Sequence, residues 1–372
     1  IEIKGVGQSL YPIAVSRFND ENKLPVSITD VVRQNLARSG YFKNTEIGNG
    51  AEDDQVIPNF KTWGSRGADA LAVGSVTQKS PGQYEIRYRL YDIRKGESLN
   101  GLIVSAGVDN LRLAAHRISD DIIFKLLGEK GVFSTRLSYV IKEGKRFRLV
   151  ISDADGQNIR NALNSSEPII SAAWSPDGQK IAYVSFEDRK PIVYVHELAS
   201  GRRIVLSNAK GNNSAPSWAP DGKSLAISLS KDGNTQIYRV NADGSNLRRL
   251  TQGSTIDTEP QFSPDGKFVY FTSDRGGNPQ IYRMSAEGER GEPARRISFK
   301  QPYATSARIS PDGKYLAYIA GVGGGFKLHL MNLLTGDTTA MTDTSFDESP
   351  SFAANGRYIL YATQVGGKKV LA

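Results

Sequence analysis

The chain has 372 residues, with 47 Lys and Arg against 39 Asp and Glu, a formal net charge of +8 and 39 % hydrophobic residues. This length predicts about two or three domains, and no apolar run approaches the ~18 residues that a membrane-spanning helix needs. The absence of cysteine excludes disulfides, zinc-thiolate sites and thiol nucleophiles. Basic residues occur in short scattered groups rather than along one helix, so we expect no nucleic-acid partner. The lack of a long apolar run predicts no membrane-embedded segment.

Two amphipathic helices are predicted in the first part of the chain. The first covers residues 27–39 and stops at Gly40, because its apolar residues recur at helical spacing: Ile28, Val31, Val32 and Leu36. The second ends at Gly128, and its apolar residues have the same spacing: Leu111, Ala114, Ala115, Ile118, Ile122, Ile123 and Leu126.

Strand-like segments alternate with these helices at residues 12–18, 69–76, 84–91 and 99–105. Strands and covering helices on one sheet make a small α/β domain, which we assign to residues 1–131. Its N-terminal arm, residues 1–10, begins with alternating apolar and charged side chains before Gly5 and Gly7. Such an arm is able to pair along a sheet edge or to swing free on its glycines.

From residue 132 onward one turn recurs between short strands. It reads Trp-Ser-Pro-Asp-Gly at 174–178, Trp-Ala-Pro-Asp-Gly at 218–222, Phe-Ser-Pro-Asp-Gly at 262–266, Ile-Ser-Pro-Asp-Gly at 309–313 and Phe-Ala-Ala-Asn-Gly at 352–356. The fourth positions lie 44, 44, 47 and 43 residues apart. A period of ~40–45 residues with four strands per unit is typical of propeller blades. We therefore predict an all-β six-bladed propeller over residues 132–372.

The strands of each type do not occur equally often. Residues 137–140 and 147–151 match the second and third strands of a unit, with no first strand before them. At the other end, residues 370–372 begin a third strand, and no outer strand follows. We expect the last blade to be incomplete, so that the chain lacks the C-terminal segment that would close the ring.

No pattern in the chain predicts catalysis. The Gly-x-Ser-x-Gly elbow of serine hydrolases is absent, and His196 and His329 fall within third strands. His116 lies one helical turn from Asp120, which is typical of a pair on a helix surface. Residues 153–156, Asp-Ala-Asp-Gly, lack the downstream Glu of a calcium loop and predict a hairpin turn. We expect no catalytic residue, no metal site and no cofactor.

The loops that enter the first strand of each unit form the candidate binding surface. They cover residues 166–168, 211–214, 256–259, 301–305 and 345–348, and in a propeller they converge on one rim of the central channel. On a basic chain they carry five carboxylates: Glu167, Asp257, Glu259, Asp347 and Glu348. Two interpretations stay open, namely solvated caps of the inner strands, or a site for a cation or for a partner that brings hydrogen-bond donors.

The combination of an α/β domain with this repeat resembles the TolB family of Gram-negative periplasmic proteins. The resemblance covers essentially the whole chain. It rests on Gly-Ser-Val-Thr at 74–77 ahead of the strand 84–91, on the helix with His116 and Ser-Asp-Asp at 119–121, on residues 131–140 and on Thr-Glu-Pro at 258–260. The turn repeat alone is weak evidence, because peptidases and lyases with propellers share it.

The resemblance implies a noncatalytic adaptor of the Tol-Pal system, located in the periplasm with its signal peptide already removed. Family members bind the lipoprotein Pal at the propeller mouth and TolA through the N-terminal segment. They support outer-membrane integrity and constriction during cell division, and some colicins exploit them. For this chain the resemblance implies a monomer whose partners are Pal, TolA and colicin translocation segments.

The resemblance also places Thr258 and Glu259 at positions that contact Pal in the family. Together with the loop residues, this gives an expected mouth site of Glu167, Asn212, Asn213, Asp257, Thr258, Glu259, Tyr303, Thr305, Asp347 and Glu348. The expected arm site is Ile1, Glu2, Ile3, Lys4, Gly5, Val6 and Gly7. The alternative is the propeller module of an enzyme, an oligosaccharide lyase or a peptidase, that acts as a substrate funnel.

Overall fold

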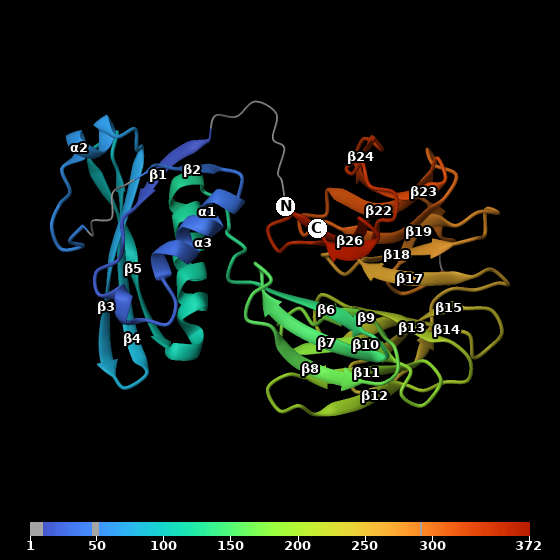
Figure 1. The fold of residues 1–372 in the computed structure, drawn as a ribbon. Helices are drawn as coiled ribbons and strands as arrows, with labels where there is room; N and C mark the ends of the chain where they lie inside the picture. The colour runs from blue at the N-terminus through green and yellow to red at the C-terminus, as the bar shows by residue number, and fades with distance from the viewer. Residues whose placement is uncertain (1–9, 47–51, 291) are drawn as a thin grey trace. The chain divides into compact units, whose positions relative to one another are not determined.

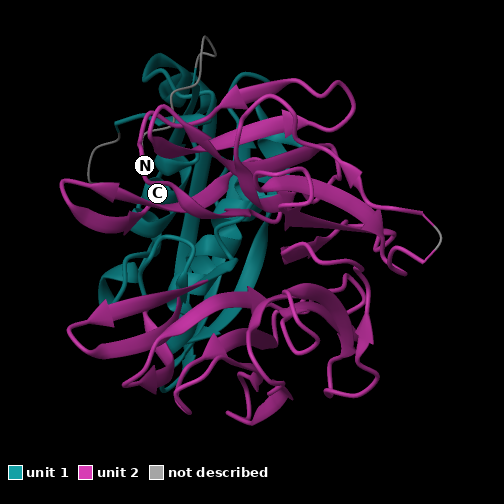
Figure 2. Cartoon of the chain, turned by 90° about the vertical axis from the view of Figure 1, so that its right-hand side faces the viewer, with its two compact units in different colours: residues 1–137, 152–158 teal, residues 138–151, 159–372 magenta. Residues whose placement is uncertain are grey.

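The computed structural model describes residues 10–46, 52–290 and 292–372. The expected arm site at residues 1–7 lies outside these residues. The chain forms two compact units, the first comprising Ile1–Leu137 and Ser152–Asn158, the second Ser138–Ile151 and Ile159–Ala372 (Figure 2). The segment Ser152–Asn158, which falls inside the sequence range assigned to the propeller, is therefore part of the first unit.

The first unit is built on a five-stranded sheet with the order β2-β1-β3-β4-β5. Its strands are β1 (Tyr11–Val15), β2 (Phe42–Asn44), β3 (Ala70–Ser80), β4 (Gln83–Asp92) and β5 (Glu97–Gly107). β1 runs parallel to β2 and β3, whereas β3, β4 and β5 are antiparallel neighbours. The short strand β2 is not among the strands predicted from the sequence.

The predicted helices are present as α1 (Ile28–Arg38) and α3 (Leu111–Leu127). Ser27 caps α1, since its Oγ accepts a hydrogen bond from the Asp30 amide at 3.1 Å. Gly128 ends α3 in a left-handed conformation with φ 70°. Both helices lie beside the sheet (Figure 1), and their apolar residues share one core with it. The third helix, α2 (Phe60–Ser65), was not predicted, and its Trp63 belongs to a second apolar cluster.

The second unit consists of six sheets, which confirms the predicted fold class of an α/β region followed by a six-bladed propeller (Figure 1). The three-stranded sheets are β6 (Arg136–Glu143), β7 (Arg146–Asp153), β8 (Arg160–Ser165) and β25 (Glu348–Phe352), β26 (Ile359–Val365), β27 (Lys368–Leu371). The four-stranded sheets are β9 (Ile169–Trp174), β10 (Lys180–Ser185), β11 (Ile192–Glu197), β12 (Arg203–Ser207); β13 (Asn213–Trp218), β14 (Ser224–Leu229), β15 (Gln236–Asn241), β16 (Arg248–Arg249); β17 (Asp257–Phe262), β18 (Phe268–Ser273), β19 (Gln280–Ser285), β20 (Arg295–Arg296); and β21 (Ala304–Ile309), β22 (Tyr315–Val322), β23 (Gly325–Asn332), β24 (Thr338–Ala340).

The recurring turn is held by its own serine and aspartate. In the turn after β9, the Ser175 hydroxyl donates to Asp177 Oδ1 at 2.5 Å and accepts from the Lys180 amide at 2.9 Å. Asp177 Oδ1 also accepts from the Gln179 amide at 3.0 Å. The hydrogen bond from Ser175 holds the pKa of Asp177 below its ordinary value. The same serine–aspartate bond closes the turns at Ser263 and Ser310, whereas alanine replaces the serine in the other two turns. The repeat is therefore a folding signal.

The first strands of the blades, β9, β13, β17, β21 and β25, are called inner strands here because successive ones contact one another. Each pairs with its second strand through a register shift. At the equivalent position each bulge has a non-glycine residue with φ between 50° and 57°: Ser171, Ala215, Glu259, Ser306 and Ser349. All five inner strands therefore have the same irregular backbone at this position. A bulge of this kind changes the direction of the neighbouring side chains.

Candidate partner-binding mouth

The ten expected mouth residues all lie in the second unit, at the start of an inner strand or in the loop before it. Three of them are almost completely buried, with exposed fractions of 0 % for Asn213, 0 % for Asp257 and 2 % for Asp347. These side chains present almost no surface to a partner in this conformation. These three residues therefore stabilise the loops of the mouth, and the surface that a partner contacts is formed mainly by the remaining residues.

Asn213 fastens the loop that precedes β13. Its Oδ1 accepts hydrogen bonds from the Ser207 hydroxyl at 2.7 Å and from the Ala209 amide at 2.9 Å. Its Nδ2 donates to the carbonyl oxygens of Ala209 at 2.8 Å and Gly211 at 3.2 Å. All the polar atoms of the amide are thus used inside one loop, as a buried amide requires.

Asp257 has the equivalent position in β17 and is paired with a cation. Both of its carboxylate oxygens accept from Arg275 Nη2, at 3.2 and 3.0 Å, and the same guanidinium binds Glu289 at 2.5 Å. Burial raises the pKa of Asp257, while Ser273 and Arg275 act in the opposite direction. The network ties the mouth loop to the neighbouring loops of the same blade.

Asp347 precedes β25 and accepts its hydrogen bonds from neutral donors. The Leu328 amide donates at 2.9 Å, and the hydroxyls of Thr344 and Thr363 donate at 2.5 and 2.7 Å, with a further bond from Thr342. Burial by itself would raise the pKa of this carboxyl, but these hydrogen bonds hold the pKa below its ordinary value. The buried carboxylate is therefore charged and fully satisfied.

Glu259 connects two inner strands. Its carboxylate accepts from the Ser306 amide and the Ser306 hydroxyl, both at 2.8 Å, and from the Thr272 hydroxyl at 2.9 Å. Ser306 lies on β21 of the next blade, and both Glu259 and Ser306 are bulge residues. Burial lowers the pKa of Arg308 on the same strand β21, and the charge of Glu259 acts against that effect. Glu259 is half-buried, so part of the residue faces solvent.

An open groove lies between the last two blades, where it takes in four of the ten expected residues: Tyr303, Thr305, Asp347 and Glu348. Its volume is about 280 Å³, and Ser306, Phe326, Phe346 and Lys369 also line it. Phe326 and Phe346 keep 43 % and 59 % of their surface exposed. We call this surface the aromatic groove.

The aromatic groove is formed because a hairpin tip pairs with the loop before β25. The Phe326 amide donates to the Ser345 carbonyl oxygen at 2.8 Å, and the Asp347 amide donates to the Phe326 carbonyl oxygen at 2.9 Å. Gly325 allows this approach, since a Cβ there would lie 2.8 Å from the Ser345 carbonyl oxygen. Tyr303 then packs edge-on against Phe326, with ring centroids 5.6 Å apart.

The rim of the aromatic groove is polar, since Glu348 forms an ion pair with Lys369 at 2.7 Å. The sequence prediction omitted Phe326, Phe346 and Lys369. Phe346 stands in a loop already singled out, and an exposed aromatic residue beside two acids was the signal for it. Phe326 and Lys369 both lie on third strands, β23 and β27, so only the fold brings them to the mouth.

The other three expected residues stand apart from the aromatic groove. Asn212 donates from its side chain to the Ser214 hydroxyl at 2.9 Å. Thr258 pairs with Thr272 in the sheet, and Glu167 is half-buried beside Ser165. These residues belong to earlier blades, so the ten residues follow the rim and do not gather at one point.

Outside the mouth, one group in the described part of the chain combines a histidine with two carboxylates, namely His116, Asp153 and Asp155. It lies in the first unit and not at the mouth. The other two histidines, His196 and His329, are buried on β11 and β23, as predicted for strand residues. No helix in the described ranges combines the length and apolar character needed to cross a bilayer.

Comparison with known proteins agrees with this architecture. A family model described as the TolB amino-terminal domain matches residues 1–99, and one described as the TolB beta propeller domain matches residues 124–372. The crystal structure of TolB from Acinetobacter baumannii is 36 % identical, covers 98 % of this chain and 90 % of that chain, and superposes with a TM-score of 0.89. A nidogen–laminin complex is similar in fold alone, at 12 % identity over 64 % of this chain and 89 % of that chain, with a TM-score of 0.52.

These matches identify a non-enzymatic propeller protein, and they set aside the alternative of an enzyme's propeller module. The two family models together cover most of both units. The chain belongs to the TolB family.

Proposed function

We propose that this chain is a periplasmic adaptor of the Tol-Pal system that binds the lipoprotein Pal at the propeller mouth and TolA through residues 1–7. In this role it supports outer-membrane integrity and constriction during cell division. Family membership supports the Tol-Pal assignment. The aromatic groove at the mouth supports this surface as the Pal-binding site.

The observation that carries the Pal proposal is the aromatic groove. Exposed aromatic side chains in a concave surface are typical anchors of protein interfaces, because a partner's apolar side chain removes them from water. Phe326, Phe346 and Tyr303 supply such anchors, and the Glu348–Lys369 pair supplies a polar rim. Core anchors surrounded by a polar rim are the usual composition of a specific interface.

Glu259 lies next to this surface. Its carboxylate binds Ser306, which itself lines the aromatic groove, so a partner in the groove would reach Glu259 without crossing another blade. The resemblance of Thr258 and Glu259 to the family motif supports a Pal contact beside the groove.

Substitution of Phe346 by alanine tests the Pal proposal directly. Phe346→Ala in the full chain should weaken binding of the soluble peptidoglycan-binding domain of Pal by about 2 kcal/mol, or ~30-fold, measured by isothermal titration calorimetry. Phe299→Ala is the matched control, because Phe299 is 68 % exposed and lines a separate hollow. Equal affinities for the two variants would contradict the placement of Pal in the groove.

The TolA proposal concerns the arm, which lies outside the described residues. Deletion of residues 1–7 should abolish binding to the periplasmic domain of TolA and leave the affinity for Pal unchanged. Loss of both affinities would argue against separate surfaces for the two partners.

A further inference from the structure

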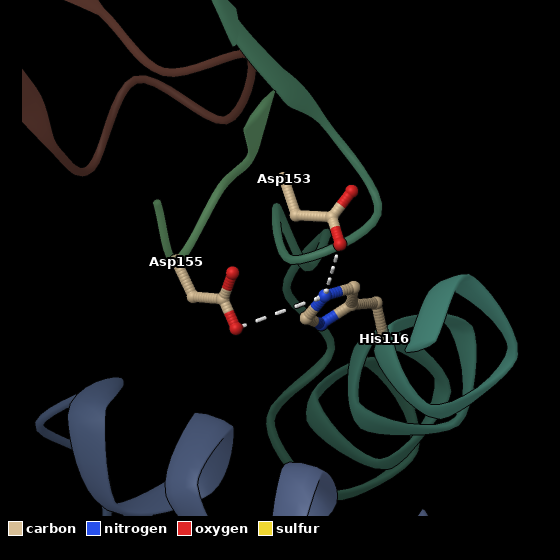
Figure 3. A group of neighbouring side chains, drawn as sticks. All are labelled: His116, Asp153 and Asp155. Carbon is tan, nitrogen blue, oxygen red and sulfur yellow. Dashed lines mark ion pairs between the residues drawn. The ribbon is translucent and has the colours of Figure 1, made fainter. Parts of the chain in front are cut away.

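A buried polar group in the first unit is not used by the proposed partner sites. His116 stands on α3, Asp153 is the last residue of β7, and Asp155 stands on the turn that follows (Figure 3). His116 Nε2 lies 3.5 Å from Asp153 Oδ2 and 4.0 Å from Asp155 Oδ2. The expected pairing of His116 with Asp120 is not what the structure has, since Asp120 accepts from the amides of Phe133 and Ser134 at 2.8 and 2.9 Å.

The two ring nitrogens of His116 have different surroundings. Nδ1 lies 2.9 Å from Asn35 Nδ2, while Asn35 Oδ1 accepts from Arg38 at 3.0 Å. This orientation makes the Asn35 amide the donor to Nδ1, so the neutral imidazole carries its proton on Nε2. Nε2 has no hydrogen-bond partner, and His116 is only 1 % exposed.

The charges of this group balance without a proton on His116. Arg112 donates from Nη2 to Asp155 Oδ2, and its Nε lies 3.6 Å from Asp153 Oδ2. Arg38 Nη2 lies 3.8 Å from Asp155 Oδ2. Two guanidinium groups therefore face two carboxylates, and this leaves no uncompensated negative charge for a metal cation.

Burial lowers the pKa of His116 below its ordinary value. The carboxylates of Asp155 and Asp153 raise it, Arg112 lowers it further, and burial is the largest effect. If the turn leaves the helices, the ring enters water, where its pKa is about 6.5. The released state then binds a proton more readily than the packed state, so acid favours release.

We propose that His116, Asp153 and Asp155 form a proton-sensitive latch that holds the turn Ser152–Asn158 against α1 and α3 while His116 is neutral. Uptake of one proton adds a positive charge to a buried group that is already balanced, and the turn is released. The turn keeps its own hydrogen bonds, from the Asp153 amide to Gln157 and from the Gly156 amide to Asp153, both at 3.0 Å. It therefore leaves as a preformed unit and does not unravel.

Hydrogen exchange of the full chain tests the latch. Protection factors of amides in the turn Ser152–Asn158, corrected for intrinsic exchange rates, should fall as the pH is lowered from 7.5 to 5.0. One coupled proton limits the fall to about tenfold per pH unit, beginning near pH 6.5. His116→Gln should abolish this pH dependence. His196→Gln is the matched control, because His196 is buried on β11 where burial and Arg203 lower its pKa, and it should leave the dependence intact.

A second measurement needs no variant. The chain has 3 histidines, so a ¹³C-histidine spectrum of the wild type resolves the titration of each ring. The His116 signal should titrate below pH 6.5 and together with the loss of protection in the turn. Constant protection of the turn between pH 7.5 and 5.0, or an equal fall in His116→Gln, would overturn the proposal.

Discussion

Buried carboxylates are stabilised in different ways in the two units of this molecule. At the mouth, Asp347 accepts only from neutral donors, which are three threonine hydroxyls and one backbone amide. In the first unit, Asp155 accepts from the Gln157 amide at 3.0 Å and faces Arg112, Arg38 and His116. Burial raises the pKa in both cases, and both carboxyls nevertheless have a pKa below the ordinary value.

The difference decides what each region is able to do. Neutral donors orient Asp347 without cancelling its charge, whereas Arg275 pairs with Asp257 elsewhere in the mouth. The region around Asp347 therefore keeps a negative field that attracts a partner with cationic or donor groups. Arginines cancel the charge of Asp153 and Asp155, so the net charge of that group changes with pH only through the protonation of His116. The mouth is therefore suited to recognition, and the cluster on α3 to a change of state.

Removal of Arg112 should have the largest effect on stability. Arg112→Met leaves Asp155, whose side chain is 3 % exposed, without its closest cation, and the free energy of unfolding should fall by about 3 kcal/mol. Urea denaturation followed by circular dichroism measures the loss. Arg148→Met is the control, since its partner Glu143 is 61 % exposed and such pairs contribute less than about 1 kcal/mol. Similar losses in both variants would show that the cluster is not a stabilising network.

Reversal of charge at Glu259 should have an effect of comparable size, on binding instead of stability. Glu259→Lys removes the acceptor of Ser306 and places a cation near Arg308, so Pal binding should weaken by on the order of 2–5 kcal/mol. Because Glu259 also bridges two blades, stability should fall too, by about 1–3 kcal/mol. Binding is therefore measured by calorimetry well below the unfolding temperature.

Glu287→Lys is the control for the Glu259 variant. It makes the same change in net charge. The Glu287 side chain is 73 % exposed in the loop between β19 and β20, where it pairs with Arg239 and Arg248. Pal affinity should stay at the wild-type value in this variant. A Glu259→Lys protein that binds within about threefold of wild type would remove Glu259 from the Pal surface.

Local signals made most of the fold predictable. Ser27 caps the start of α1 and Gly128 the end of α3, each through a hydrogen bond to a residue within one turn. The serine–aspartate turns likewise close within five residues. The elements that escaped prediction depend on distant partners. β2 has three residues and exists because β1 pairs with it, and α2 has six residues and is held by an apolar cluster around Trp63.

The mouth was predictable as a place and less so as a set of contacts. The repeat located its loops, but whether a polar residue faces out or folds back depends on the loop around it, as Asn213 shows. Phe326 reaches the aromatic groove only through the pairing of a hairpin tip with the loop before β25. His116 and Asp153 meet across 37 positions of sequence, a distance at which periodicity carries no information.

The smallest effect concerns a single neutral donor in a recurring turn. The Ser310 hydroxyl donates to Asp312 Oδ1 at 2.6 Å and accepts from the Tyr315 amide at 2.9 Å. Ser310→Ala leaves that amide without its partner, so the free energy of unfolding should fall by about 1 kcal/mol, with an unchanged denaturant slope. The variant should still fold, because Ala219 occupies the same position in another blade.

Loss of the Ser310 hydroxyl should also change the titration of Asp312. The hydrogen bond from Ser310 holds the pKa of Asp312 below its ordinary value, so the pKa should rise in Ser310→Ala, as measured by carboxyl ¹³C shifts. A neutral donor would then be shown to stabilise a carboxylate charge without cancelling it, which is the property assigned to the mouth. An unchanged pKa would mean that the amide of Lys314, at 3.1 Å from Asp312 Oδ1, is sufficient by itself. The contrast between neutral and cationic donors would then rest on Asp347 and Asp155 alone.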